Sequence, residues 1–138
     1  MSKSTNYFNT FIEVAEDCPA PVAEVPQPKA NVQTVASLQH EMIAGNLYTY
    51  TSDDVLFDVH ATRQAIAEND KASAREAFFN KDQACLRASP LGKRHGWGIH
   101  HNADGRVALV AVESSDYRTF VNDEGLKHLK AMRSKRAT

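Results

Sequence analysis

An Asp-Gly pair between two strand-like runs constrains the fold of this chain more than any other sequence feature. Asp104 and Gly105 separate a short mixed run, Trp97–His101, from a longer apolar run, Val107–Val112. This arrangement predicts a β-hairpin, because both central residues of a type I′ turn need a positive φ. Pairing across such a turn places four residues on one face of the sheet: Trp97, Ile99, Val110 and Val112.

The remaining pattern predicts an α+β fold, a small mostly antiparallel sheet with the hairpin at its centre and about five flanking helices. The clearest helix start is Thr51, because Asp54 stands three residues later as in a capping box. The other elements follow from apolar spacing and turn residues. In chain order we expect a strand at 7–14, helices at 31–44, 51–66 and 71–79, a short strand at 85–88, the hairpin, and helices at 114–121 and 123–133.

A chain of 138 residues predicts a single domain, spanning 1–138. Four of the five prolines lie within residues 19–30. Because proline removes a backbone donor and favours extended neighbours, this stretch predicts a loop that covers the surface, or alternatively a Pro-rich ligand for another protein. Residues 134–138 are expected to fray.

Composition excludes several classes of protein. No apolar run approaches the ~20 residues of a membrane span, and the first residues show no apolar segment of signal-peptide type, so we expect a cytoplasmic protein without a membrane partner. Cys18 and Cys85 have no metal-ligand spacing, and adjacent residues on a strand, such as His100 and His101, point to opposite faces. We therefore expect no metal and no cofactor.

Charge is unevenly distributed along the chain. Residues 1–80 carry five Lys/Arg against eleven Asp/Glu, whereas residues 81–138 carry eleven against six. This asymmetry is typical of a protein with an anion-binding face. The alternative is that the acidic half complements the basic half within one fold or across a dimer.

The strongest candidate for a site is the basic, Gly-rich segment Leu91–Gly96, which we expect to be a loop before the hairpin. It matches neither a P-loop nor a dinucleotide-binding fingerprint. Its glycines permit close backbone approach, and its cations can hold phosphate or carboxylate, although a plain turn with solvated charges explains the same residues. The candidate ligand-binding residues are Arg87, Lys93, Arg94, His95, Gly96, Trp97 and His101.

Three functions are consistent with these residues. The first is a binding module for an anionic partner, either a phosphate-bearing small molecule or a nucleic acid. The second is a small enzyme in which His95 or His101 acts as general base, a role that suits a group titrating near neutrality. The third is a structural protein or homodimer that uses the Trp97/Ile99/Val110/Val112 face as its interface.

Four separated segments carry a resemblance to a known family: NYFNTFIEVAEDCP, YTSDDVLF, ACLRASPLGKRHGWGIH and AMRSKR. Together they resemble a family of small, mainly bacterial proteins that is known only as a domain of unknown function. The resemblance extends from Asn6 to Arg136 and implies a stand-alone single domain. It implies no activity, cofactor or catalytic residue.

Overall fold

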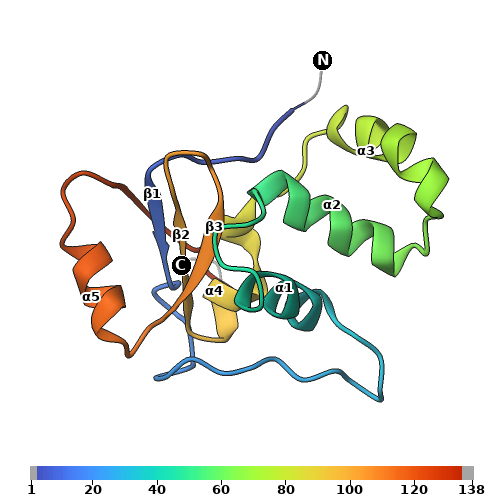
Figure 1. Cartoon of the computed structure of the whole chain (residues 1–138). Coiled ribbons are helices and arrows are strands. Elements are labelled where there is room, and N and C mark those ends of the chain that lie inside the picture. The colour runs from blue at the N-terminus through green and yellow to red at the C-terminus, as the bar shows by residue number, and fades with distance from the viewer. Residues whose placement is uncertain (1–2, 135–138) are drawn as a thin grey trace.

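A computed structural model describes residues 3–134 as a four-stranded sheet flanked by helices, which confirms the α+β prediction (Figure 1). The strand order is β3-β2-β1-β4; β2 is antiparallel to both neighbours, and β4 runs parallel to β1. The elements are β1 (Thr10–Glu13), α1 (Val35–Ala44), α2 (Ser52–Arg63), the 3-10 turn η1 (Glu68–Asp70), α3 (Lys71–Phe79), the 3-10 turn η2 (Leu86–Ala88), α4 (Pro90–Arg94), β2 (Trp97–His101), β3 (Val107–Ala111), α5 (Ser115–Val121) and β4 (Lys127–Lys130).

The sheet buries both of its faces. On one face Ile12, Ile99 and Val107 join a core cluster with residues of α1, α2 and α4. On the other face Phe11 packs edge-to-face against Tyr117 of α5, with ring centroids 5.1 Å apart. In Figure 1, α5 accordingly lies on the opposite side of the sheet from α1, α2 and α4.

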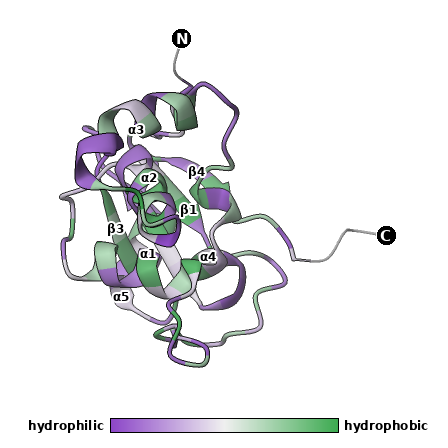
Figure 2. Cartoon of the chain, turned by 90° about the vertical axis from the view of Figure 1, so that its right-hand side faces the viewer, coloured by the Kyte–Doolittle hydropathy of each residue, from purple (hydrophilic) through white to green (hydrophobic). Residues whose placement is uncertain are grey.

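Helix α3 is the outlying element of the fold. It reaches the rest of the molecule mainly through α2, where Phe78 and Phe79 form an aromatic cluster with Phe57. Figure 2 shows apolar residues concentrated in the sheet and α1, and hydrophilic residues prominent on α3. The pocket between α3 and the start of α2 is lined by both polar and apolar residues: Ser4, Asp53, Arg75 and Glu76 with Ala72 and Phe79.

The helix starts show where sequence rules sufficed. Thr51 caps α2 as predicted: its hydroxyl accepts from the Asp54 N–H, and the Asp54 carboxylate accepts from the Thr51 N–H. The start of α1 was predicted at Asn31, and this is wrong. Asn31 and Ala30 both have positive φ and form a tight turn, so Thr34 becomes the N-cap.

The hairpin exists, but its turn differs from the prediction. Of the Asp-Gly pair only Gly105 has a positive φ, of 79°, and the Asn102 N–H donates to the Arg106 carbonyl at 2.9 Å. The Asn102 side-chain oxygen also accepts from the N–H groups of Asp104 and Arg106. The connection is thus a three-residue loop that ends in a glycine bulge, not a type I′ turn.

One extra loop residue shifts the register of β3 by one position. Trp97 pairs with Ala111 and Ile99 pairs with Leu109, so Val110 and Val112 lie on the face opposite Ile99. Ile99 is 1% exposed beneath the helices and Val110 is 6% exposed beneath α5. The expected Trp97/Ile99/Val110/Val112 interface therefore does not exist. Burial is expected for both Val110 and Val112 of this face; Val110 is buried, whereas Val112 is only partly buried.

The segment before the hairpin is helical, which corrects two predictions. Residues 85–88 are not a strand but contain η2, and the expected loop Leu91–Gly96 is mostly α4. The reason is the Ser89-Pro90 pair: the Ser89 hydroxyl accepts from the Leu91 N–H and Pro90 occupies the first helical position. The same pair directly follows the predicted strand at 85–88.

Two further predictions fail at the sheet edges. The expected helix at 123–133 is β4, because the open edge of β1 offers backbone partners to 127–130 that override the three-residue spacing of the leucines. The first strand is shorter than 7–14, because Asn9 has a positive φ of 47° and Phe8 is 56% exposed. The predicted frayed tail at 134–138 lies, except for Ser134, outside the described residues.

No helix within residues 3–134 has the length and apolarity needed to cross a membrane.

Candidate anion-binding site

A pocket of about 470 Å³ lies between α4, the first turn of α1 and the Pro-rich segment. It contains two of the predicted site residues, Arg94 and His95, which end α4. Its lining residues are Pro26, Gln27, Lys29, Thr34, Val35, Ala36, Pro90, Arg94 and His95. The pocket has three basic side chains and no acidic one.

Lys29 and Arg94 are the fixed positive charges of this pocket. Both side chains belong to exposed residues, and within residues 3–134 neither forms an ion pair or a side-chain hydrogen bond. Lys29 is positioned by two backbone hydrogen bonds with Val32 across the tight turn, at 3.0 and 2.8 Å. Arg94 is positioned by α4, so the cations come from two segments that approach the pocket from different sides.

The first turn of α1 adds backbone donors to the same space. The Thr34 hydroxyl caps the Ser37 N–H, which leaves the N–H groups of Val35 and Ala36 without a partner in the described part of the chain. Both residues line the pocket. Because the positive end of the helix dipole lies there, these N–H groups complement an anion.

His95 contributes a titratable group. Burial lowers the pKa of its imidazole, the Glu24 carboxylate opposes this shift, and neighbouring Arg94 lowers the pKa further. The distance from His95 Nδ1 to Glu24 Oε1 is 3.9 Å, which is too long for a hydrogen bond. The imidazole is therefore held mostly neutral and gains a proton more readily when an anion lies beside it.

Gly96 and Trp97 fix the wall of the pocket instead of facing into it. The Trp97 indole N–H donates to the Glu24 carbonyl at 2.7 Å, and the Glu24 N–H donates to the His95 carbonyl at 2.8 Å. Gly96 has a positive φ of 81°, and a Cβ at this position would come within 2.9 Å of the Val22 carbonyl oxygen. These contacts hold the Pro-rich segment against α4.

His40 is close to this cluster, although no sequence pattern indicated it as a site residue. Its ring centroid lies 5.2 Å from the Trp97 ring, and its pKa is lowered by burial and by the nearby His95 imidazole. It lines an adjoining hollow that shares Pro26 and Gln27 with the basic pocket. The nearby His95 imidazole therefore disfavours protonation of His40.

Three predicted site residues lie elsewhere. Arg87 donates from Nε to the Lys130 carbonyl at 2.8 Å and so ties η2 to β4. Lys93 precedes Arg94 in α4 but does not line the pocket. His101 is at the far end of β2 from Trp97 and is fully buried.

His101 occupies a position unsuited to proton transfer with a ligand. Neither ring nitrogen has a hydrogen-bond partner in the described structure, and the Tyr7 ring lies 5.4 Å away in an edge-to-face arrangement. Burial, with a smaller effect from His100, lowers the pKa of His101 to about 4. Its imidazole is therefore neutral at physiological pH and inaccessible.

Sequence comparison extends the resemblance along nearly the whole chain. The model of the family of unknown function DUF6157 matches residues 2–137. The chain belongs to this family. No curated protein and no solved structure matches it.

Sequence reasoning found Arg94 and His95 but missed the other half of the pocket. Lys29 belongs to a stretch interpreted only as a covering loop, and Val35 and Ala36 were placed inside a helix starting too early. The available signal was Thr34 with Ser37 three residues later, a second capping pair close to a lysine.

Among residues 3–134 no group of three or more His, Cys, Asp or Glu side chains could hold a metal ion.

Proposed function

We propose that this chain is a binding protein for phosphate-bearing small molecules, which it holds in the pocket of Lys29, Arg94 and His95. The observation that carries the proposal is that two cations share one concavity with two N–H groups of a helix start, and that within residues 3–134 neither the cations nor these N–H groups have a partner. Charge-assisted hydrogen bonds from such donors are about twice as strong as neutral ones. The volume of about 470 Å³ suits a small molecule better than an extended nucleic acid.

Calorimetric titration of Arg94→Gln and Lys93→Gln tests this proposal. Loss of a charged hydrogen bond at Arg94 should weaken binding of pyrophosphate or a nucleoside diphosphate about 10- to 100-fold. Lys93→Gln removes the same charge one residue away, outside the pocket, and should change the affinity little. Added salt should weaken wild-type binding.

Two results would contradict the proposal: no heat of binding at millimolar ligand, or equal losses in the two variants. The second would indicate diffuse attraction by the basic half of the chain. A short oligonucleotide that binds more tightly than the nucleoside diphosphate would instead favour nucleic acid as the partner.

A second candidate function is acid–base catalysis on the same bound molecule. The observation that favours it is the Glu24 carboxylate 3.9 Å from the imidazole of His95, since a carboxylate that closes this distance to a hydrogen bond can orient an imidazole that accepts a proton. Hydrolysis of an aryl phosphate that is lost in His95→Gln and kept in His40→Gln would support it. If the wild-type chain shows no turnover, binding remains the only proposed function.

We also propose a single domain, which the family match over residues 2–137 supports. The cytoplasmic location stays a prediction from the sequence.

A further inference from the structure

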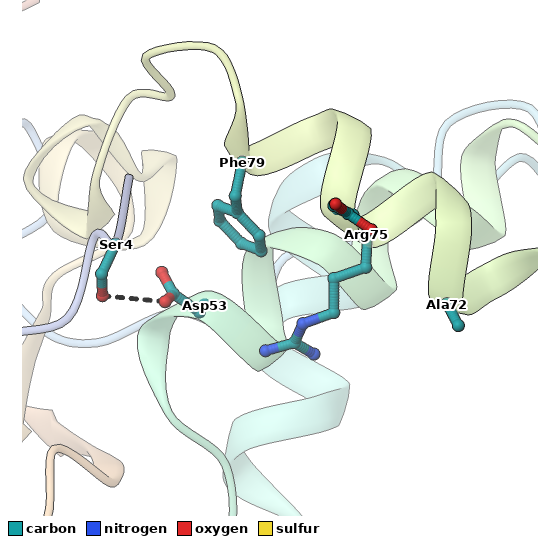
Figure 3. A pocket seen from close by; sticks show the side chains of 6 residues that line it. Ser4, Asp53, Ala72, Arg75 and Phe79 are labelled. Carbon is teal, nitrogen blue, oxygen red and sulfur yellow. Dashed lines mark hydrogen bonds between the residues drawn. The ribbon is translucent and has the colours of Figure 1, made fainter. Parts of the chain in front are cut away.

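A second pocket, of about 480 Å³, shares no lining residue with the basic pocket. It lies where the N-terminal segment and the start of α2 meet one face of α3 (Figure 3). Its lining residues are Ser4, Asp53, Ala72, Arg75, Glu76 and Phe79. The four residues from α3 recur at the spacing of one helical face.

Arg75 is held rigidly at one side of this pocket. Its Nη2 donates to Asp54 Oδ1 at 2.9 Å, and its guanidinium carbon lies 5.9 Å from the Phe57 ring centroid and 5.6 Å from that of Phe79. A guanidinium carries five N–H donors, and within residues 3–134 Asp54 is the only hydrogen-bond acceptor that Arg75 meets. Most of its donors are therefore free for a further acceptor.

Asp53 and Glu76 leave this pocket with an excess of negative charge. Asp53 accepts from the Ser4 hydroxyl at 2.8 Å and from the N–H and hydroxyl of Thr5, each at 2.7 Å. These donors are neutral, and Glu76 has no ion-pair partner in the described region. Since Asp54 already balances Arg75, the two remaining carboxylates favour a cationic group.

We propose that this pocket binds a free amino acid or a closely related small zwitterion. Its ammonium group lies between Asp53 and Glu76, its carboxylate accepts from the free donors of Arg75, and its side chain contacts Phe79 and Ala72. In Figure 3 the Arg75 guanidinium extends from α3 past the Phe79 ring, and the Asp53 carboxylate lies across the pocket, turned toward the Ser4 hydroxyl to which it is hydrogen-bonded. Arginine is suited to this role because its planar donors match the geometry of a carboxylate.

The test is an amide-resolved NMR titration with phenylalanine and two matched analogues, phenethylamine and phenylpropanoate. Each analogue lacks one charged group and keeps the ring. We expect phenylalanine to bind, with shifts at Ala72, Glu76 and Phe79, and each analogue to bind about 10- to 100-fold more weakly. Equal binding of phenylalanine and phenethylamine, or no shift with phenylalanine at millimolar concentration, would overturn the proposal.

Two variants separate binding from folding. Glu76 makes no side-chain contact that stabilises the described structure, so Glu76→Gln should keep the fold and weaken phenylalanine binding about tenfold. Glu124→Gln removes an exposed carboxylate outside the pocket and serves as the matched control. Equal affinity in Glu76→Gln and Glu124→Gln would contradict the assignment of the ammonium position.

Discussion

Arg75 and Arg94 each line a pocket, but only Arg75 is already paired with a carboxylate. Asp54 meets its guanidinium at 2.9 Å, whereas Arg94 has no ion-pair partner in the described structure. The same residue type therefore contributes to a pocket with excess negative charge in one case and excess positive charge in the other. The net charge that a pocket offers to a ligand therefore depends on which charged side chains have no ion-pair partner within the protein. The number of basic residues in the pocket does not determine it.

The largest expected effect is a loss of folding stability at low pH caused by His101, which lines neither pocket. This loss limits the pH range in which ligand binding to the two pockets can be compared. The pKa of His101 is about 4 in the folded chain and about 6.5 in the unfolded chain. Between these values the unfolded chain binds the extra proton, so stability falls as pH is lowered from about 6.5 to 4, by roughly 3 kcal/mol.

Urea unfolding at pH 7 and pH 4 measures this loss, and His101→Leu should remove most of the contribution of this residue. His40, His95 and His100 also have lowered pKa values and add a smaller slope of the same sign. If His101→Leu loses as much stability on acidification as the wild type, a buried neutral His101 is ruled out.

The next effect bears on the basic pocket alone. Gly96→Val should destabilise the fold by about 2–4 kcal/mol, because a β-branched residue resists the φ of 81° and its Cβ would meet the Val22 backbone. The Pro-rich segment that carries Lys29 would then be displaced. Gly45→Ala, at an exposed helix end with a negative φ, is the control and should change stability far less.

Thermal or urea unfolding of Gly96→Val and Gly45→Ala measures the two losses of stability. A Gly96→Val protein as stable as Gly45→Ala would show that the Pro-rich segment is not fixed against α4.

The two arginines should differ in their contribution to stability. Arg75→Ala loses packing against two rings and a charged hydrogen bond that is partly exposed, and we expect a cost of about 1–2 kcal/mol. Arg94→Ala should stay within about 0.5 kcal/mol of the wild type, as is usual for surface positions without partners. Equal costs in urea unfolding would contradict the distinction between Arg75, which the fold pairs with a carboxylate, and Arg94, which has no such partner in the described structure.

The sequence was sufficient where local chemistry decides the structure. Thr51 and Asp54 satisfy each other at the start of α2, and 71–79 forms a helix with the predicted bounds. The sequence was insufficient where a segment takes its structure from a partner far away in the chain or from the length of a loop. Residues 127–130 have helical spacing but complete the open edge of β1, and the register of β3 depends on one additional loop residue beside Gly105.

The same division applies to the candidate site. Arg94 and His95 could be selected because basic residues are visible in a sequence. Whether a carboxylate already neutralises a given cation cannot be predicted from the sequence. Lys130 and Arg133 contact Glu16, which lies more than a hundred residues earlier in the chain. Lys29 and Arg94 have no such partner in the described structure. The helix start that completes the pocket also depends on the positive φ of Ala30 and Asn31.

Amide-resolved NMR titration with pyrophosphate tests the central claim most directly. The N–H groups of Val35 and Ala36 line the basic pocket without a partner in the described part of the chain, and they should show the largest shifts, together with Arg94 and His95. The amide of Arg75 should stay unmoved, because its pocket carries excess negative charge. Shifts spread over the basic surface, with Val35 and Ala36 unaffected, would contradict an anion site at the start of α1.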